Sequence, residues 1–358
     1  MGCLGFEDDT MNTPNQDNRA NQQRVAQSDT QASSITTVGS EAEASSGKPG
    51  PNHSFGVVGL GAMGFGAASS LLRAGFSVWG CDLRDTTRKA FSDLGGHSCL
   101  RAAELAHCDA VMVMVVNAAQ TEAVLFEEQG LLGPDPQQSR MRAGSVILAC
   151  ATVAPDDARA LATRVAEYGV LMLDTPVSGG PAKAAQASMT VMGSGPKQAF
   201  DKVKPLLDAV SARCYQLSEA IGVGSTVKMV NQLLAGVHIA AAAEAMALGI
   251  RSGADPHALY EVISHSAGNS WMFENRVPHI LQGDYTPLSA VNIFVKDLGI
   301  VLDSARKLPF PLPLSATAHQ MYLAASAAGH GLEDDAAVIQ FFAKLTGIDL
   351  PAKQTDQG

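Results

Sequence analysis

Short, uninterrupted apolar runs alternate with segments of helical periodicity from residue 54 onwards. The clearest run is AVMVMVV at residues 110–116, in which no polar residue breaks the pattern. Val-rich runs of this kind are typical of strands that are covered on both faces, as in parallel sheets. Strands are likewise predicted at residues 55–58, 77–81, 145–149, 170–173, 189–192 and 214–217, with helices at 64–74, 86–94 and 155–168. The alternation over residues 54–217 predicts a Rossmann-type α/β domain, doubly wound around a mainly parallel sheet.

The pattern changes after residue 222. Residues 225–251 contain no proline and are rich in alanine, which predicts one long buried helix. At ~1.5 Å per residue this helix would be about 40 Å long, enough to connect two domains. Helical periodicity continues to about residue 345, so residues 218–350 are predicted to form an all-helical C-terminal domain for substrate binding and oligomerisation, followed by a tail at 351–358.

Residues 1–53 differ from the rest of the chain. They are rich in Ser, Thr, Gln and Asn, carry seven acidic and three basic side chains, and lack aliphatic periodicity. Such a segment buries too little apolar surface to offset the entropy of ordering. It is predicted to be a disordered N-terminal extension without an assigned function.

Charge and cysteine content restrict the classes of partner. The net charge of −10 and the lack of a basic block argue against nucleic acid and against an anionic membrane surface. The six cysteines form no pattern with metal-ligand spacing, so no metal site is expected and the thiols are predicted to be reduced and buried. No apolar run approaches the ~18 residues that span a bilayer, so no membrane-spanning segment is expected. A cytoplasmic protein is predicted.

A glycine-rich turn follows the first predicted strand. It consists of Gly59, Leu60, Gly61, Ala62, Met63 and Gly64. In a G-x-G-x-x-G turn between strand and helix, the first glycine allows the tight turn, the second lets a pyrophosphate approach the backbone, and the third permits close helix–strand packing. The helix N-terminus offers free N–H groups to the phosphates. The turn predicts a dinucleotide site.

An acidic residue, Asp82, lies 23 positions after Gly59 at the end of the second predicted strand. A carboxylate here accepts hydrogen bonds from ribose hydroxyls and repels a 2′-phosphate, which favours NAD over NADP. Arg84 lies two residues further on and could instead reach a 2′-phosphate. NAD is the predicted cofactor, with NADP as the alternative.

Four ordered blocks make the chain from 54 to about 350 resemble the β-hydroxyacid dehydrogenase family. The blocks are the glycine-rich turn, DTPVSGG at 174–180, GSTVKMVNQ at 224–232 and FVKDL at 294–298. The resemblance implies that Lys228 is the catalytic acid/base. The residues agree, since a lysine near the start of an apolar helix is partly desolvated and its pKa falls towards working pH. Asn231, on the same helical face, is the implied substrate partner.

The resemblance also implies how substrate and cofactor are held. Ser178, Gly179 and Gly180 are expected to bind the substrate carboxylate through the hydroxyl and the exposed backbone N–H groups. The residues expected beside the cofactor's nicotinamide end are Val116, Asn117, Thr152 and Lys296. Trp271 and Phe294 are interpreted either as pocket walls or as core residues.

These patterns predict NAD-dependent oxidation of a small anionic 2- or 3-hydroxy acid by a homo-oligomer, a dimer or tetramer. Residues 266–276 most resemble the branch of the family that oxidises L-threonate to its 2-oxo acid. One alternative is an NADPH-dependent reductase of glyoxylate or of succinic or tartronate semialdehyde. Another, of a different class, is a dinucleotide-binding scaffold without catalysis.

Overall fold

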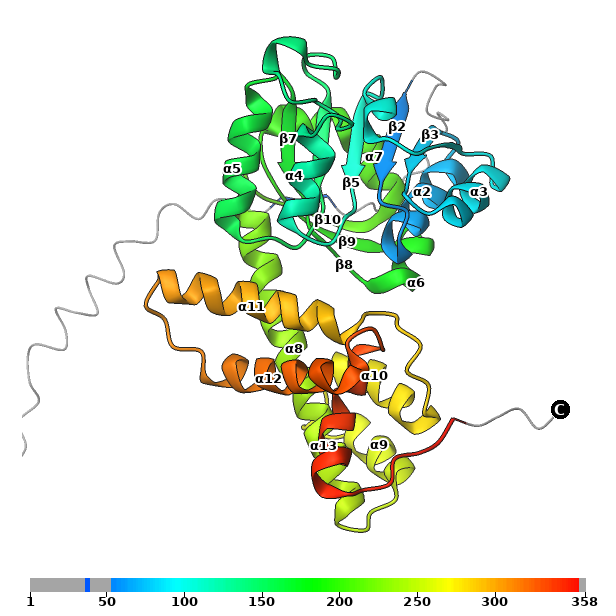
Figure 1. Cartoon of the computed structure of the whole chain (residues 1–358), viewed down its shortest axis with the longest axis vertical. Helices are drawn as coiled ribbons and strands as arrows, with labels where there is room; N and C mark the ends of the chain where they lie inside the picture. Colours follow the sequence, from blue (N-terminus) through cyan, green and yellow to red (C-terminus); the bar gives the residue numbers. More distant parts are fainter. Residues whose placement is uncertain (1–35, 39–52, 354–358) are drawn as a thin grey trace, which may run out of the picture. The chain divides into compact units, whose positions relative to one another are not determined.

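A computed structural model describes residues 36–38 and 53–353 (Figure 1). The strands in these residues are β1 (Thr36–Val38), β2 (Ser54–Val58), β3 (Ser77–Cys81), β4 (His97–Cys99), β5 (Ala110–Val113), β6 (Val146–Ala149), β7 (Leu171–Asp174), β8 (Val177–Ser178), β9 (Met189–Ser194) and β10 (Ser211–Ser218). The helices of the same region are α2 (Ala62–Arg73), α3 (Asp85–Asp93), α4 (Ala118–Phe126), α5 (Pro155–Ala166), α6 (Gly180–Ala185) and α7 (Lys197–Val210). The helices that follow are α8 (Val223–Arg251), α9 (Pro256–Ser264), α10 (Trp271–Gln282), α11 (Val291–Lys307), α12 (Pro313–Ala325) and α13 (Ile339–Thr346).

The strands form one sheet in the order β1-β10-β9-β7-β6-β5-β2-β3-β4, and β8 pairs with β9. All neighbours from β7 to β4 are parallel, as are β9 and β10, whereas β1, β8 and the β7–β9 contact are antiparallel. The predicted mainly parallel, doubly wound fold is confirmed. The chain winds from β2 towards β4 and then returns to β5 on the other side of β2. The carboxyl ends of β2 and β5 therefore form the topological switch point where such sheets bind ligands.

The central strands are apolar at every position because both faces of the sheet are covered. In β5, Ala110 and Met112 pack in one core cluster with side chains of α2 and α7, while Val111 and Val113 pack in another with side chains of α4 and α5. Figure 1 shows α4 and α5 together on one side of the strands. An uninterrupted apolar run is thus the pattern that a strand between two helical layers requires.

The predicted strand at residues 110–116 ends earlier than expected, at Val113. The Met114 N–H still donates to Val58 O at 2.8 Å, but the chain then turns away at the glycine-rich end of β2. The apolar residues 114–116 therefore form the loop beside the switch point.

Within the segment predicted to be disordered, residues 36–38 form β1, which pairs antiparallel with β10. The prediction is wrong for these three residues. β10 is otherwise an edge strand with unpaired N–H and C=O groups, and the β-branched sequence TTV can supply partners for them. The rest of the extension up to residue 52 lies outside the described residues.

Helix α8 has the length and composition of a membrane span, so the expectation that no segment would reach this length is wrong. Its 29 residues run from the sheet domain into the C-terminal helices, where α10, α11, α12 and α13 contact it (Figure 1). Ala235, Ile239, Ala243 and Met246 are buried in that helical core. In this structure α8 is therefore the central helix of the predicted all-helical domain.

Candidate active site

The glycine-rich turn lies at the switch point, and its shape depends on the absence of side chains. Gly59 has a φ of +91°, and a Cβ there would lie 2.6 Å from Met114 O at the end of β5. A Cβ on Gly64, in the first turn of α2, would lie 1.8 Å from Gly59 O. A Cβ on Gly61 would meet no atom of the described residues within 4 Å, so in this part of the structure the position faces open space. The site therefore combines two packing glycines with one that leaves room for a ligand.

Helix α2 begins beside that open space without a side-chain cap. Its N-cap is Gly61, and no side chain of residues 53–353 caps the helix. The first turn, which includes Ala62 and Met63, contains no acidic residue. The N–H groups and the positive end of the helix dipole are thus available to an anion. These residues fit the pyrophosphate of a dinucleotide.

Asp82 follows β3 and is paired with Arg84. The Leu60 N–H donates to the Asp82 carboxylate at 2.9 Å, and the Arg84 guanidinium donates to both carboxylate oxygens at 3.0 Å. Burial alone would raise the pKa of Asp82, but the hydrogen bonds from Arg84 and Leu60 outweigh it and the pKa is lowered. Asp82 is therefore a carboxylate anchored beside the turn, with the Arg84 guanidinium as its partner.

The four residues expected at the nicotinamide end come from two domains. Asn117 is the N-cap of α4 and accepts from the Gln120 N–H at 2.8 Å, and the neighbouring Val116 is exposed. Lys296, on α11 of the helical domain, donates to the backbone oxygen of Thr152 at 3.2 Å. Thr152 follows β6, so this contact joins the helical domain to the carboxyl edge of the sheet.

Lys228 lies in the second turn of α8 and is only 8% exposed. Its Nζ donates to Gln232 Oε1 at 2.8 Å, and Asn231 Nδ2 donates to the same oxygen at 3.1 Å. Gln232 Nε2 in turn donates to Asp297 at 2.5 Å, and Asp297 forms an ion pair with Lys296. The predicted catalytic lysine, its neighbour Asn231 and the Lys-Asp pair of α11 are thus connected through Gln232.

The environment of Lys228 shifts its protonation equilibrium towards the neutral amine. Burial lowers the pKa of Lys228 to about 8, with the nearby Lys296 acting in the same direction and Asp297 acting against it. An amine with such a pKa exchanges protons readily near neutral pH, which is what acid/base catalysis requires.

The start of α8 is attached to the sheet by the buried carboxylate of Asp174, at the end of β7. Asp174 Oδ2 accepts from the N–H groups of Gly222 and Ser225 at 3.1 and 2.8 Å, and Oδ1 accepts from the Ser225 hydroxyl at 2.7 Å. Ser194 Oγ donates to the same carboxylate at 3.1 Å. Because Ser225 lies one helical turn before Lys228, Asp174 fixes the position from which the lysine extends.

Four of the expected residues can be located relative to one pocket of about 320 Å³. Ser178, Gly179 and Asn231 line it, whereas Gly180 is not among its lining residues and instead begins α6. The pocket is completed by Lys183, Thr190, Leu234, Ala235, His238, Trp271 and Met272. The lining combines a few polar groups with apolar walls, as small-molecule sites usually do.

The structure separates the two aromatic residues whose roles were left open. Trp271 lines the pocket and is 55% exposed, whereas Phe294 is buried in the helical core and stacks on Tyr322. The pocket-wall interpretation therefore fails for Phe294.

Four residues of the site have no predicted role. Lys183, Thr190 and His238 line the pocket, and Gln232 connects Lys228 to Asn231. The spacing of Asn231, Ala235 and His238 by four and three residues could have identified one face of α8. Lys183 has no comparable pattern, because its place in the pocket depends on the short helix α6.

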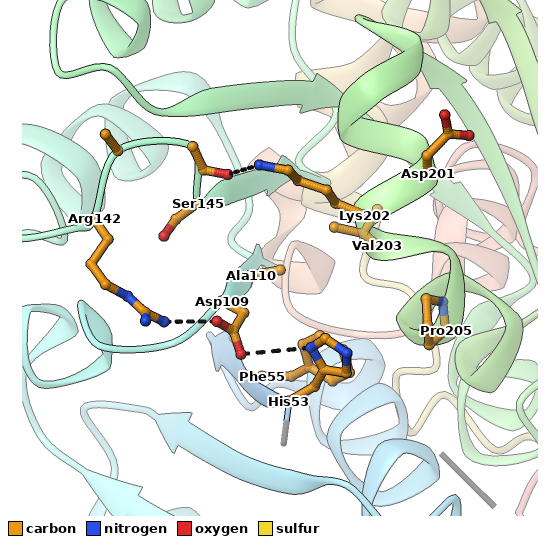
Figure 2. Close-up of a pocket in the computed structure, with 12 residues that line it drawn as sticks. His53, Phe55, Asp109, Ala110, Arg142, Ser145, Asp201, Lys202, Val203 and Pro205 are labelled. Carbon is orange, nitrogen blue, oxygen red and sulfur yellow. Dashed lines mark hydrogen bonds and ion pairs between the residues drawn. The ribbon is translucent and has the colours of Figure 1, made fainter. Parts of the chain in front are cut away.

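A larger cavity of about 550 Å³ lies at the opposite, amino-terminal edge of the strands (Figure 2). Its charged groups already have partners. Arg142 pairs with Asp109 at 2.7 Å, His53 lies 3.8 Å from the same carboxylate, and Lys202 donates to Gly144 O at 2.9 Å. Despite its size, this cavity is the weaker candidate, because none of the glycine-turn or α8 residues reaches it.

Two family models match the chain. One, described as the NAD binding domain of 6-phosphogluconate dehydrogenase, matches residues 54–218. The other, described as NAD-binding of NADP-dependent 3-hydroxyisobutyrate dehydrogenase, matches residues 222–342. Their boundary coincides with the start of α8.

Curated relatives and solved structures agree with these models. The chain is 61% identical over 303 residues to an L-threonate dehydrogenase of Cupriavidus necator, covering 84% of this chain and 99% of that protein. It is 49% identical to an L-threonate dehydrogenase of Escherichia coli K12, covering 86% and 100% respectively. A crystal structure described as 3-hydroxyisobutyrate dehydrogenase from Salmonella typhimurium matches with a TM-score of 0.76 and 50% identity, covering 81% of this chain and 99% of that chain.

Proposed function

Because the chain belongs to the 3-hydroxyisobutyrate dehydrogenase-like family of β-hydroxyacid dehydrogenases, we propose that it oxidises L-threonate to the corresponding 2-oxo acid. The family makes it a nicotinamide-dependent oxidoreductase that acts on a CH–OH group. The observation that carries the proposal is a buried amine, Lys228, whose contacts through Gln232 connect it to Asn231 on the wall of a small pocket with polar groups and apolar walls.

The proposed chemistry divides between cofactor and protein. A nicotinamide dinucleotide, when bound, accepts the hydride from the carbon that carries the hydroxyl. Neutral Lys228 takes the hydroxyl proton at its Nζ, and burial lowers its pKa to about 8, so that the neutral form is accessible. Asn231 Nδ2, held by Gln232 at 3.1 Å, fixes the local geometry and can donate its second hydrogen to a substrate oxygen.

The cofactor would be held along the carboxyl edge of the sheet. We assign the pyrophosphate to the turn Gly59–Gly64 at the N-terminus of α2, and the nicotinamide end to Val116, Asn117, Thr152 and Lys296. Ser178 and the backbone of Gly179 and Gly180 are assigned to the substrate carboxylate. Three of these roles draw support from position, since Thr152 follows β6, the glycine turn follows β2 and Ser178 is the last residue of β8.

The substrate assignment draws on the relatives. Five curated L-threonate dehydrogenases are 49–61% identical to this chain, whereas a 2-(hydroxymethyl)glutarate dehydrogenase of Eubacterium barkeri is 33% identical. A pocket of about 320 Å³ has room for a small acid of this kind.

NAD is the proposed cofactor because Asp82 is a carboxylate at the end of β3. Arg84 now donates to both oxygens of Asp82, so ribose hydroxyls must replace some of these hydrogen bonds. If Arg84 instead turned to a 2′-phosphate, Asp82 would still repel that phosphate. The ion pair therefore leaves NAD favoured.

The test is a panel of four-carbon sugar acids, 3-hydroxyisobutyrate and glycerate with NAD⁺ or NADP⁺, followed by absorbance of the reduced cofactor at 340 nm. The proposal expects the highest kcat/KM with L-threonate and NAD⁺. Turnover of 3-hydroxyisobutyrate or glycerate without turnover of L-threonate would overturn the substrate. Preferential NADPH-dependent reduction of glyoxylate or a semialdehyde would favour the reductase alternative, and binding of NAD without any turnover would favour the scaffold.

A homo-oligomer in the cytoplasm completes the proposal. The cytoplasm is supported by Cys81, Cys99, Cys108, Cys150 and Cys214, all buried free thiols. Analytical ultracentrifugation of the purified full chain tests the oligomeric state.

A further inference from the structure

One cationic side chain in the substrate pocket has no part in the chemistry above. Lys183, on α6, lines the pocket together with Ser178 and Gly179. Among the described residues its ammonium makes no hydrogen bond or ion pair, whereas Lys197 and Lys204 in the same domain each pair with an aspartate four residues later. Lys183 is thus a charge beside the pocket that the protein's own described residues leave unneutralised.

The backbone of the pocket is shaped to hold this side chain. A Cβ on Gly179 would lie 2.8 Å from both Cβ and Cδ of Lys183, and Gly179 has a φ of +131°. The aliphatic stem of Lys183 therefore packs directly against Gly179, in the space that any other residue would fill. Long stems of this kind bury their methylene groups while the charged end stays in solvent. The packing holds the stem of Lys183 beside Gly179, so its ammonium can reach a carboxylate bound at this part of the pocket.

The charge balance of the pocket gives Lys183 a specific role. No Asp or Glu is among the lining residues. Lys228 must lose its proton to act as a base, so it cannot also supply a permanent charge. Ser178 and Gly179 offer only neutral donors to a carboxylate, whereas an ammonium donor adds the attraction of a full opposite charge.

From this arrangement we propose that Lys183 binds the carboxylate of the substrate and makes the pocket selective for hydroxy acids over neutral polyols. The inference rests on the proposed function, because it takes an anionic hydroxy acid as the occupant of this pocket. It adds a charged determinant to the neutral Ser178–Gly179 backbone site. Lys183 is a binding residue in this scheme and exchanges no proton.

The test compares Lys183→Met and Lys183→Arg with the wild type, using whichever acid of the panel the wild type oxidises fastest. Lys183→Met should raise KM roughly tenfold, the effect of about 1.4 kcal/mol, and leave kcat within about threefold. Lys183→Arg should restore most of the loss. Lys204→Met, an exposed lysine of α7, is the control for the change in net charge.

Two further readouts separate charge from structure. Wild-type kcat/KM should fall with added NaCl, because salt screens exposed charges, and this dependence should flatten in Lys183→Met. Inhibition by the neutral polyol threitol should be equal in both proteins, as should the Kd for NAD⁺. A KM within twofold of the wild type, or an unchanged salt dependence, would overturn the role of Lys183.

Failure of the proposed function gives a different result. If the wild type oxidises no acid of the panel, calorimetric titration of L-threonate into the NADH-bound protein still tests Lys183. Binding to the wild type that Lys183→Met weakens would support the carboxylate site without the reaction. Equal binding to both proteins, or binding to neither, would overturn it.

Discussion

The pKa of Lys228 depends on its burial and on the charges of Asp297 and Lys296. This pKa sets the pH at which the amine can act as a base. Burial lowers the pKa to about 8. In the oxidation direction the neutral amine is the active form, so the rate should rise with pH and level off above about 8. In the reduction direction the ammonium is needed and the rate should fall over the same interval. Profiles of log kcat/KM against pH for oxidation and for reduction measure these changes. Profiles that both rise or both fall with pH would contradict the role of Lys228.

Removal of the Lys228 amine should abolish catalysis without loss of the cofactor site. General acid/base groups contribute about 10²–10⁴-fold to rate, so Lys228→Met should lose activity in that range. The glycine turn lies on β2 and α2, and titration of NAD⁺ by fluorescence should give an unchanged Kd. A variant that keeps more than a tenth of wild-type kcat would exclude Lys228 as the acid/base.

Asp297 acts on Lys228 from α11. Its charge raises the pKa of Lys228 and it accepts a hydrogen bond from Gln232 at 2.5 Å. In Asp297→Asn the pKa of Lys228 should fall further, which moves the rising limb of the oxidation profile to lower pH. Asp303→Asn on the same helix removes a carboxylate that pairs with Arg306 at the surface, and its profile should match the wild type. A profile that moves to higher pH in Asp297→Asn would contradict the electrostatic argument.

At the scale of elements, the first turn of α8 is attached to the ends of two strands, to β7 through Asp174 and to β9 through Ser194. Asp174, 1% exposed, accepts hydrogen bonds from Ser194 and from both the N–H and the hydroxyl of Ser225. Its negative charge also lies at the positive end of the α8 dipole. Lys228 lies three residues after Ser225 on α8, so its position depends on this attachment.

Loss of that carboxylate should therefore reduce both stability and rate. Asp174→Ala leaves several buried donors without an acceptor, and we expect a loss of about 3 kcal/mol in the free energy of unfolding by urea denaturation. Ser225→Ala removes one hydroxyl and should cost about 1 kcal/mol. The kcat of Asp174→Ala, measured below its melting temperature, should fall more than its affinity for NAD⁺. A variant as stable as the wild type would show that the helix start is held elsewhere.

Elements with a strong periodic pattern could be predicted from the sequence, while features that depend on packing could not. The apolar run of β5 and the glycine turn indicated the sheet and its cofactor edge because both encode local geometry. β1 could not be predicted, because a strand of three residues forms only where an edge strand such as β10 offers backbone hydrogen-bond partners. Phe294 and Trp271 are both aromatic, and only their tertiary surroundings place one in the core and the other at the pocket. The place of Lys183 in the pocket could not be predicted, because it depends on the packing of its stem against Gly179.

At the scale of the whole molecule, the active site needs the helical domain to contact the sheet edge. Two lysines of α11 make such contacts. Lys296 donates to Thr152 O at the proposed nicotinamide end, while Lys307 pairs with Asp156 on α5 at 2.9 Å. Lys296 is largely buried and also pairs with Asp297, whereas Lys307 and Asp156 are both exposed. Both contacts join the helical domain to the sheet domain. The Lys296 contact lies at the proposed nicotinamide end, and the Lys307 contact lies at the surface.

Comparing variants of Lys296 and Lys307 distinguishes the effect of domain contact from the effect of a group at the active site. Lys296→Met removes a donor to Thr152 O and leaves the buried Asp297 without its ion-pair partner, so we expect a higher KM for NAD⁺ together with a kcat reduced about tenfold or more. Lys307→Met breaks only a solvent-exposed pair, whose net contribution is small, and both constants should stay close to those of the wild type. Initial rates at varied NAD⁺ and saturating hydroxy acid measure the difference. Equal losses in both variants would mean that closure of the domains alone, and no specific group at the nicotinamide end, limits the reaction.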